Sequence, residues 1–323
     1  MTPGNPFPAT VPPRPPRISK WGDRIYLALL LLATAGVVAL MVALVAVLVN
    51  GSGLAFKAFG FSYIWGYYWN PENGVYGLGP AIQGTLITSA IALLIAVPLG
   101  LGAAIFLTQQ APAWLRAPVG QLIELLAAIP SIVYGFWGLI ILVPIMAKVV
   151  EPRLIKYLGW TGLFNATPIG IDILTASLVL SVMVIPTVTA ISRDSIAAVP
   201  RSQKEAALAI GATDWEVTRH AILPYARSGI VAGAVLGLGR ALGETMAVLF
   251  VIGNHTVIVN SLLAQGQTIP SLIANVWFEN NTTLERPALV YAALVLLVIT
   301  LAINLGARLV LTRSQAGRGA AAE

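Results

Sequence analysis

The stretch GIVAGAVLGLGRALGETMAVLFVIG, residues 229–253, decides how this chain folds. It is apolar almost throughout, and its only charged residues are Arg240 and Glu244. An apolar run of about 20 residues is long enough to cross a bilayer as an α-helix. A charge at the centre of a bilayer costs at least about 2.5 to 3.5 kcal/mol on insertion scales. The stretch therefore predicts a membrane helix, and it raises the question of what Arg240 is for.

The composition of the whole chain agrees with a membrane protein. Of its 323 residues 57% are hydrophobic and only 10% are charged, against about 25% charged in soluble domains. The absence of cysteine from the sequence excludes disulfides, thiolate metal sites and a cysteine nucleophile. The two histidines, His220 and His255, lie far apart and have no ligand spacing, so we predict neither a metal site nor a cofactor. We expect an all-α, polytopic membrane protein.

The apolar runs predict about six transmembrane helices. Prolines 98, 130, 144 and 186 fall inside these runs, and we expect the first three to kink or interrupt their helices. Membrane helices tolerate proline because neighbouring helices can satisfy the freed backbone groups. The predicted spans are Leu27–Val49, Ala81–Thr108, Val119–Ala147, Ile171–Ile191, Gly229–Ile252 and Pro287–Leu311.

The lysines and arginines predict the orientation of these spans. Six spans place both termini on one side, and most of the 19 basic residues fall on that side. Cytoplasmic segments carry the excess of lysine and arginine, so both termini are predicted to be cytoplasmic. The exceptions are Arg240, within a span, and the outer residues Lys57, Lys148, Arg153, Lys156 and Arg286.

Four regions follow along the chain. Residues 1–20 form a proline-rich arm, and 21–80 hold the first helix and an outer loop rich in aromatic residues. Residues 81–312 form the transmembrane core, which includes a long inner loop at 192–228, and 313–323 form a tail. Polar residues argue against a seventh span at 257–278, so we expect its IPSLIANVWF to be a short interfacial helix on the outer side.

The inner loop contains EAALAIGATDWEVTRHAILP, residues 205–224. We expect a short amphipathic helix that closes at Gly211, because glycine permits the positive φ of such a turn. A second helix is expected to start at Thr213 or Asp214 as N-cap and to end at Pro224. Periodicity alone favours an ordinary amphipathic connector on the membrane surface.

The spacing in this loop resembles the EAA signature of ABC-importer permeases. That pattern is E-A-A, three residues, G, nine residues and I-x-L-P, and Ala221 departs from it where the family has isoleucine. The resemblance implies a type I importer permease fold and a loop that couples to an ATPase. No Walker A sequence occurs in the chain, so nucleotide would be bound by separate subunits. The residues that carry this coupling would be Glu205, Ala206, Ala207, Gly211, Leu223 and Pro224.

Three further stretches, WNPENGVYGLGPAIQGTL (69–86), IPSIVYGFWGL (129–139) and GRALGETMAV (239–248), resemble the phosphate permeases of the PstC type. The resemblance covers about residues 20–315. It implies a non-enzymatic permease subunit of a phosphate importer in the bacterial inner membrane, surrounded by lipid. It also implies a second permease of the PstA type, two ATPases of the PstB type and an external phosphate-binding protein of the PstS type.

The residues themselves give Arg240 a matching role. A guanidinium stays protonated and offers a planar fork of donors that suits phosphate oxygens. We expect a second basic group from the partner permease, and we expect glycines 233, 237, 239 and 243 to allow close helix packing around the site.

Three acids lie in or beside the spans. Glu244, four residues after Arg240, is expected on the same helix face, where it either tunes anion binding or forms a structural ion pair. Glu124 is expected to pair structurally, and Asp172 to favour a helix N-terminus.

Three alternatives stay open. The cargo could be another oxyanion, such as sulfate or molybdate. A membrane enzyme would need a cluster of His, Asp or Glu, and none has metal-ligand spacing. An ungated anion channel would conduct phosphate without ATPases. The net charge of +6 does not indicate nucleic-acid binding, because in a membrane protein the distribution of charge matters more than its sum.

Overall fold

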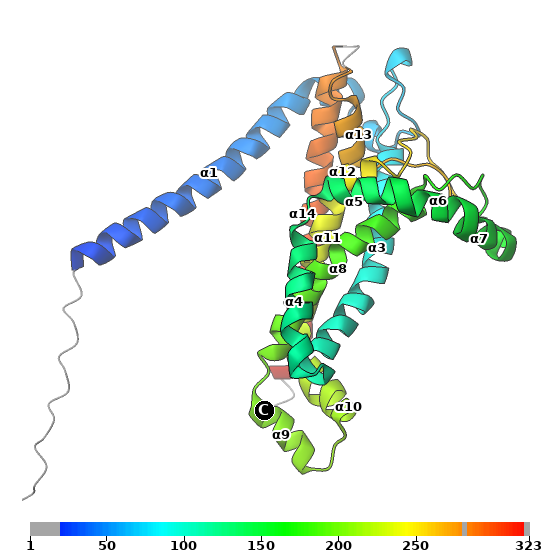
Figure 1. Ribbon diagram of the computed structural model, residues 1–323. Helices are drawn as coiled ribbons and strands as arrows, with labels where there is room; N and C mark the ends of the chain where they lie inside the picture. Colours follow the sequence, from blue (N-terminus) through cyan, green and yellow to red (C-terminus); the bar gives the residue numbers. More distant parts are fainter. Residues whose placement is uncertain (1–19, 280–282, 320–323) are drawn as a thin grey trace, which may run out of the picture. The chain divides into compact units, whose positions relative to one another are not determined.

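The computed structural model describes residues 20–279 and 283–319, and all regular structure in these ranges is helical (Figure 1). The proline-rich arm lies outside the described residues except for Lys20, and so do residues 320–323 of the predicted tail. The helices are α1 (Lys20–Phe59), α2 (Ser62–Trp65), α3 (Gly79–Ile105), α4 (Ala113–Ala128), α5 (Ser131–Trp137), α6 (Val143–Ile145), α7 (Glu151–Leu158), α8 (Ile173–Ala197), α9 (Arg201–Ala209), α10 (Asp214–Val217), α11 (Leu223–Gly243), α12 (Met246–Leu249), α13 (Ile269–Val276) and α14 (Glu285–Gly319).

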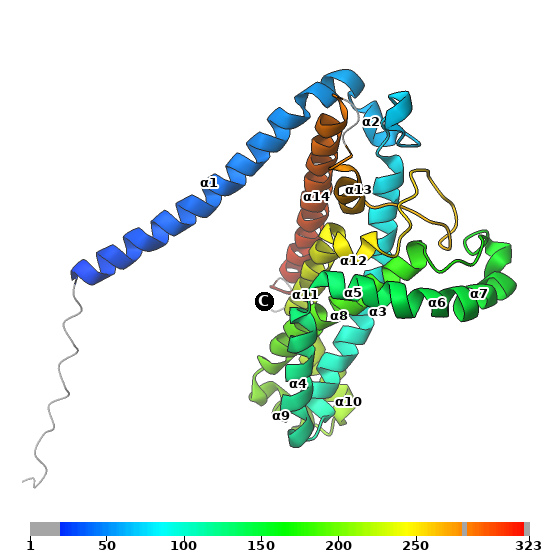
Figure 2. The ribbon, with the colours of Figure 1, turned by 45° about the horizontal axis from the view of Figure 1, so that its top comes forward.

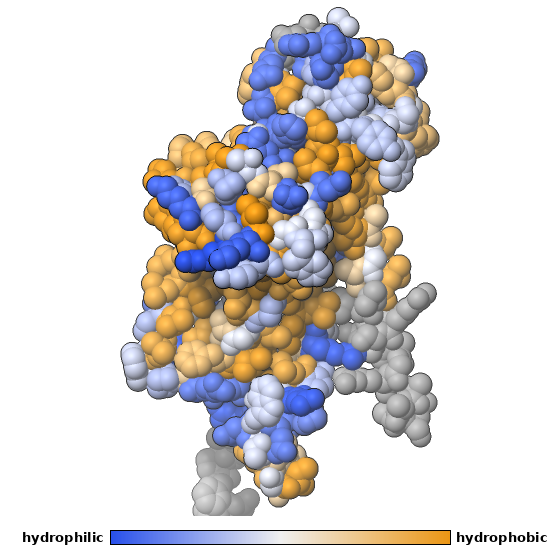
Figure 3. Space-filling model, turned by 90° about the vertical axis from the view of Figure 1, so that its right-hand side faces the viewer, coloured by the Kyte–Doolittle hydropathy of each residue, from blue (hydrophilic) through white to orange (hydrophobic). Residues whose placement is uncertain are grey.

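Six helical stretches in the described ranges are long and apolar enough to cross a membrane, which confirms the predicted all-α membrane fold. The chain divides into two units, Met1–Val47 and Leu48–Glu323. Within the second unit, the face seen in Figure 3 carries a broad band of hydrophobic side chains with hydrophilic side chains at both ends. The candidate spans are Trp21–Phe59, Gly79–Gln110, Ser131–Thr161, Ile173–Ala197, Asp214–Gly243 and Glu285–Leu309.

The core of the second unit is built around α8, which packs against α3 and α11. Small residues let α3 approach α8 closely. Ala92 and Ala96 are fully buried, and a Cβ at Gly100 would lie 3.0 Å from Val188 of α8. Close packing of this kind holds membrane helices together, because the lipid is as apolar as the side chains. The α8 helix is therefore the fixed element against which the other spans are placed.

The expected third span, Val119–Ala147, is interrupted at Pro130 as predicted, but its bounds are wrong, because the candidate span starts after this break and runs over Ser131–Thr161. Ile129 and Pro130 are extended, with ψ of 131° and 138°, and they separate α4 from α5. The ring of Pro130 disfavours the helical conformation for the residue before it. Pro144 does not interrupt the chain, since the π-helical turns Gly138–Leu142 and Met146–Val150 flank it. Figures 1 and 2 show the result: α4 runs alongside α3 and α8, whereas α5, α6 and α7 run across them.

The outer loops pack on themselves rather than only facing a headgroup layer. Tyr63 and Trp69 of the aromatic-rich outer loop are 1% and 4% exposed. The hydroxyl of Tyr63 donates to the carbonyl of Ala288 at 2.7 Å, which ties the loop to α14. Gln83 of α3 exchanges two hydrogen bonds with the backbone of Val259. The short helix expected in IPSLIANVWF is α13, and it packs against α3 and α14.

Two fully buried acids join α7 to α8. Asp172 is the N-cap of α8, as expected, and its Oδ1 accepts the Thr175 N–H at 2.7 Å. Glu151 accepts the Gly170 N–H through its Oε2 at 3.1 Å. Burial raises the pKa of the Asp172 carboxyl above its usual value, and neighbouring N–H donors oppose that rise. Backbone donors thus compensate for placing these acids in the interior.

Candidate functional site

The α11 helix carries Arg240, and two of its glycines fix its position. A side chain at Gly233 would lie 3.2 Å from Ile191, and one at Gly237 would lie 2.9 Å from Val184, both on α8. These two positions confirm the expected close packing. A side chain at Gly239 or Gly243 would meet nothing within 4 Å, so those two glycines are not packing positions.

The helix ends at Gly243, so the expected span Gly229–Ile252 is wrong at both ends. Glu244 is extended, with φ −71° and ψ 127°, and α12 begins two residues later. The Glu244 carboxylate accepts the Ala247 N–H at 3.4 Å, at the start of α12, where a negative charge is favourable. The expectation that Arg240 and Glu244 share a helix face is therefore wrong. No ion pair or hydrogen bond joins the two side chains.

Arg240 is half-buried and lines a groove of about 570 Å³ between α11 and α14. Among the side chains that the structure describes, it has no hydrogen-bond or ion-pair partner. A desolvated charge without a partner is costly, which makes this guanidinium the candidate group of the site. The residues that line the groove are Val235, Leu236, Gly239, Arg240, Leu301, Asn304, Leu305 and Arg308.

Sequence reasoning missed the residues that α14 contributes to this groove. Asn304 and Arg308 are four residues apart, which places them on one face of α14. They are polar in a helix whose other residues at this level are apolar. That spacing was the available signal, but nothing in the sequence placed this face opposite Arg240.

The stretches 129–139 and 239–248 meet in the fold beside this site. The α5 helix packs on α12, with the rings of Phe136 and Phe250 4.6 Å apart. Tyr134 donates its hydroxyl to the Leu126 carbonyl at 2.8 Å, across the break between α4 and α5. The helix that follows the break after α11 thus packs on the helix that follows the break after α4.

We predict that Gly135→Ala destabilises the protein. The new Cβ would lie 2.8 Å from Phe250 and 3.0 Å from the Cα of Ala247, and backbone yields little. Overpacking of this kind typically costs about 1–3 kcal/mol. The control is Gly102→Ala on α3, which meets nothing within 4 Å and gains helix propensity. Thermal unfolding in detergent should show a lower midpoint for Gly135→Ala alone, and equal midpoints for the two variants would contradict the prediction.

The inner loop folds as a helix, a tight turn and a second helix. Gly211 has φ +87° and closes α9, as expected. Thr213 is the N-cap of α10 and forms a capping box with Glu216. Glu205 and Ala206 are exposed on α9, whereas Ala207 packs towards the buried Ile222. Ile222 therefore fills the hydrophobic position beside Ala221, where the sequence departs from the EAA pattern.

Pro224 does not end the second helix, contrary to expectation. Helix α10, a π-helical turn at Thr218–Ile222 and α11 follow one another without a break, and Leu223 and Pro224 begin α11. Proline lacks an N–H, and its ring clashes with a carbonyl one turn earlier in an α-helix. A wider π turn relieves that conflict. The loop is consequently connected to Arg240 by one helical segment, Asp214–Gly243.

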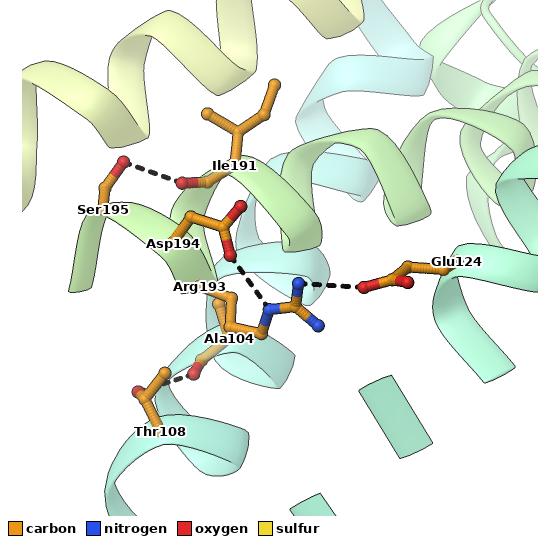
Figure 4. Close-up of polar contacts among 7 residues, drawn as sticks. All are labelled: Ala104, Thr108, Glu124, Ile191, Arg193, Asp194 and Ser195. Carbon is orange, nitrogen blue, oxygen red and sulfur yellow. Dashed lines mark hydrogen bonds and ion pairs between the residues drawn. The ribbon is translucent and has the colours of Figure 1, made fainter. Parts of the chain in front are cut away.

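The pairing expected for Glu124 is present, between α4 and α8 (Figure 4). Its Oε1 lies 3.0 Å from Nη2 of Arg193 on α8, and Nε of Arg193 lies 3.2 Å from Oδ1 of Asp194. The Glu124 side chain is 58% exposed. A pair at this exposure contributes about 0–1 kcal/mol, so its role is structural and weak.

Comparison with known proteins identifies the family. The family described as "Binding-protein-dependent transport system inner membrane component" matches residues 96–315. The phosphate transport system permease protein PstC of Pasteurella multocida is 47% identical over 284 residues, 87% of this chain and 88% of that protein. The chain belongs to the PstC family. The PstC protein of Mesorhizobium japonicum is 48% identical over 274 residues, 84% of each chain.

Solved structures place this PstC-family chain in the fold of ABC-importer permeases, as the EAA resemblance implied. A chain of a bacterial alginate ABC transporter superposes with a TM-score of 0.58 at 17% identity, over 89% of this chain and 95% of that one. A chain of the MetNI methionine ABC transporter, in an inward-facing conformation, gives 0.52 at 16% identity, over 72% and 95%. At these identities the likeness concerns the fold alone. Arg240, Glu244 and the 205–224 loop all lie within the residues that match the family.

Proposed function

We propose that this PstC-family chain is a permease subunit of an ATP-driven importer of inorganic phosphate, and that Arg240 holds the anion in its half of the path. The single observation that carries the proposal is the unpaired guanidinium of Arg240 in the groove between α11 and α14. The names of the relatives at 47% and 48% identity support phosphate as the anion. The chain itself carries no catalytic residue in this proposal.

Phosphate needs a cation on this route because a low-dielectric interior disfavours a desolvated anion. Guanidinium compensates with a fixed fork of N–H donors and keeps its charge at every relevant pH. Lysine would be a point charge, and burial can neutralise it. A partner permease of the PstA type would contribute a further basic group across the path.

Glu244 stays part of the proposed path in a changed role. Its carboxylate contacts the start of α12 rather than Arg240. We infer that Glu244 fixes the break after α11 and leaves the guanidinium free for an anion. A direct ion pair would compete with phosphate, so this separation favours binding and release over permanent neutralisation.

The loop 192–228 is proposed to couple ATP hydrolysis to transport. It would dock on one of two PstB-type ATPases, through Glu205, Ala206 and the exposed tip at Gly211. Ile210 beside this tip is 87% exposed, which suits burial against a partner. Movement of the loop on the ATPase would reach α11 through Leu223 and Pro224, which lie in the same helical segment as Arg240, Asp214–Gly243. Ala207 would contribute by its packing against the cluster that contains Ile222. Movement of this segment would alternate access to the path.

The proposed setting is the bacterial inner membrane, with both termini in the cytoplasm. The distribution of lysine and arginine supports this orientation. An external PstS-type protein would deliver phosphate to the opposite face, formed by the segments 50–80, 148–170 and 253–286.

Copurification and uptake test this proposal together. We expect the tagged chain to bring down one further permease and an ATPase, and the reconstituted complex to take up labelled phosphate only with ATP. Excess sulfate or molybdate should leave this uptake unchanged, whereas arsenate should compete. Uptake inhibited by sulfate would indicate another oxyanion, and passive phosphate conductance without the ATPase would indicate a channel.

A further inference from the structure

The groove that contains Arg240 holds a second arginine of the same chain. Arg308 lines it from α14, together with Asn304 one turn earlier. Among the described residues that line the groove there is no acid, and neither Arg308 nor Arg240 has an ion-pair partner in the part of the chain that the structure describes. Oδ1 of Asn304 is buried and has no hydrogen-bond partner there. The groove therefore carries uncompensated positive charge, and this charge is what would attract an anion.

The two arginines lie towards opposite ends of the groove. The α11 helix starts from α10 and α14 starts near α13, so the two helices run in opposite directions (Figures 1 and 2). Arg240 is the last lining residue on α11, so it lies level with the first lining residues of α14. Arg308 is the last lining residue on α14, so it lies towards the end that carries α9 and α10. Asn304 lies between them.

We propose that Arg308 and Asn304 form a second phosphate-binding position in this groove, which receives the anion from Arg240 on its way to the face that carries the 192–228 loop. The inference rests on the proposed function, because it needs Arg240 to bind phosphate. A small oxyanion can be handed between two guanidinium groups without full rehydration, since each offers charge-assisted donors. The Nδ2 group of Asn304 can supply a neutral donor between the two positions, whereas its Oδ1 only accepts and offers the anion no hydrogen bond.

The competing explanation is that Arg308 only marks the cytoplasmic end of its span. It lies three residues before Leu311, where the predicted apolar span ends, and arginine near the end of a span commonly reaches the interface. A residue with that role would be replaceable by any group that tolerates water. It would have no relation to phosphate.

Transport kinetics separate the two explanations. Arg308→Gln should lower the maximal rate of phosphate uptake by about tenfold, the usual cost of a charge-assisted hydrogen bond. Arg308→Lys should also lower the rate, though less than Arg308→Gln, because the charge remains but the planar fork of donors is lost. Arg24→Gln is the matched control, because it removes an exposed basic residue near the start of α1, and it should transport normally. A normal rate for Arg308→Gln would overturn the inference while leaving the role of Arg240 intact, whereas a normal rate for Arg240→Gln would overturn the proposed function itself.

Thiol labelling gives a second readout that does not depend on turnover. The chain contains no cysteine, so a single introduced cysteine is the only target on this subunit. Asn304→Cys in the full complex should react with a negatively charged methanethiosulfonate, and phosphate should slow this reaction while chloride does not. Ala302→Cys, exposed and outside the groove lining, should show no protection by phosphate. Equal labelling of Asn304→Cys with and without phosphate would overturn the proposal.

Discussion

Arg240→Lys is expected to lower phosphate uptake by about 10- to 100-fold, while the complex still assembles. The lysine keeps the positive charge but loses the planar fork, and it reaches the groove with a single donor group. The loss should appear mainly in the maximal rate, because the external binding protein would still capture phosphate. Initial rates of labelled phosphate uptake into proteoliposomes measure it.

The matched control is Arg193→Lys. Arg193 is also an arginine within a span, but Glu124 and Asp194 already pair with it, and its side chain is 28% exposed. A lysine there can keep an ion pair, so uptake should change less than about twofold. Wild-type uptake by an assembled Arg240→Lys complex would remove Arg240 from the path.

Gly211→Leu is expected to disconnect ATP hydrolysis from transport. Gly211 has φ +87°, a conformation that costs a residue with a Cβ about 1–2 kcal/mol. A Cβ there would meet nothing within 4 Å, so the effect comes from backbone strain rather than from a clash. Relief of the strain would change the angle between α9 and α10, and with it the surface offered to the ATPase. The stimulation of ATPase activity by the phosphate-loaded binding protein should be largely lost.

Gly211→Asn provides the control for this prediction. Asparagine tolerates positive φ better than other residues with a Cβ, so it should keep most of the stimulation. If the stimulation of ATPase activity falls from glycine to asparagine to leucine at position 211, the backbone conformation of the turn is the cause. Unchanged stimulation in Gly211→Leu would show that the loop geometry does not control the ATPase.

Several features could be predicted from the sequence because they depend on neighbouring residues. The apolar runs of α3, α8 and α14 are long enough for a bilayer, so their existence follows from local hydropathy. The turn at Gly211 and the cap at Thr213 follow from backbone sterics and from one side chain three residues away. The EAA spacing and the stretch around Arg240 were enough to indicate the family.

Other features were mispredicted because the decisive contact lies elsewhere in the chain. The sequence fits one helix through Arg240 and Glu244, but α12 packs on α5 and Glu244 contacts the start of α12. Pro224 looks like a helix end, but a π-helical turn lets the helix continue into the next span. The interruption at Pro130 was predicted, but the bounds of the third span were not, because the candidate span lies wholly after the break, over Ser131–Thr161.

The sequence by itself determined that this chain crosses a membrane as helices, where its coupling loop turns, and that an arginine lies inside a span. Each of these is a short-range property of hydropathy or backbone sterics. Only the tertiary structure decided what surrounds that arginine: Glu244 is directed to α12, and Asn304 and Arg308 are brought to the same groove. Those neighbours come from helix packing, which depends on how distant surfaces fit together and has no local sequence signal.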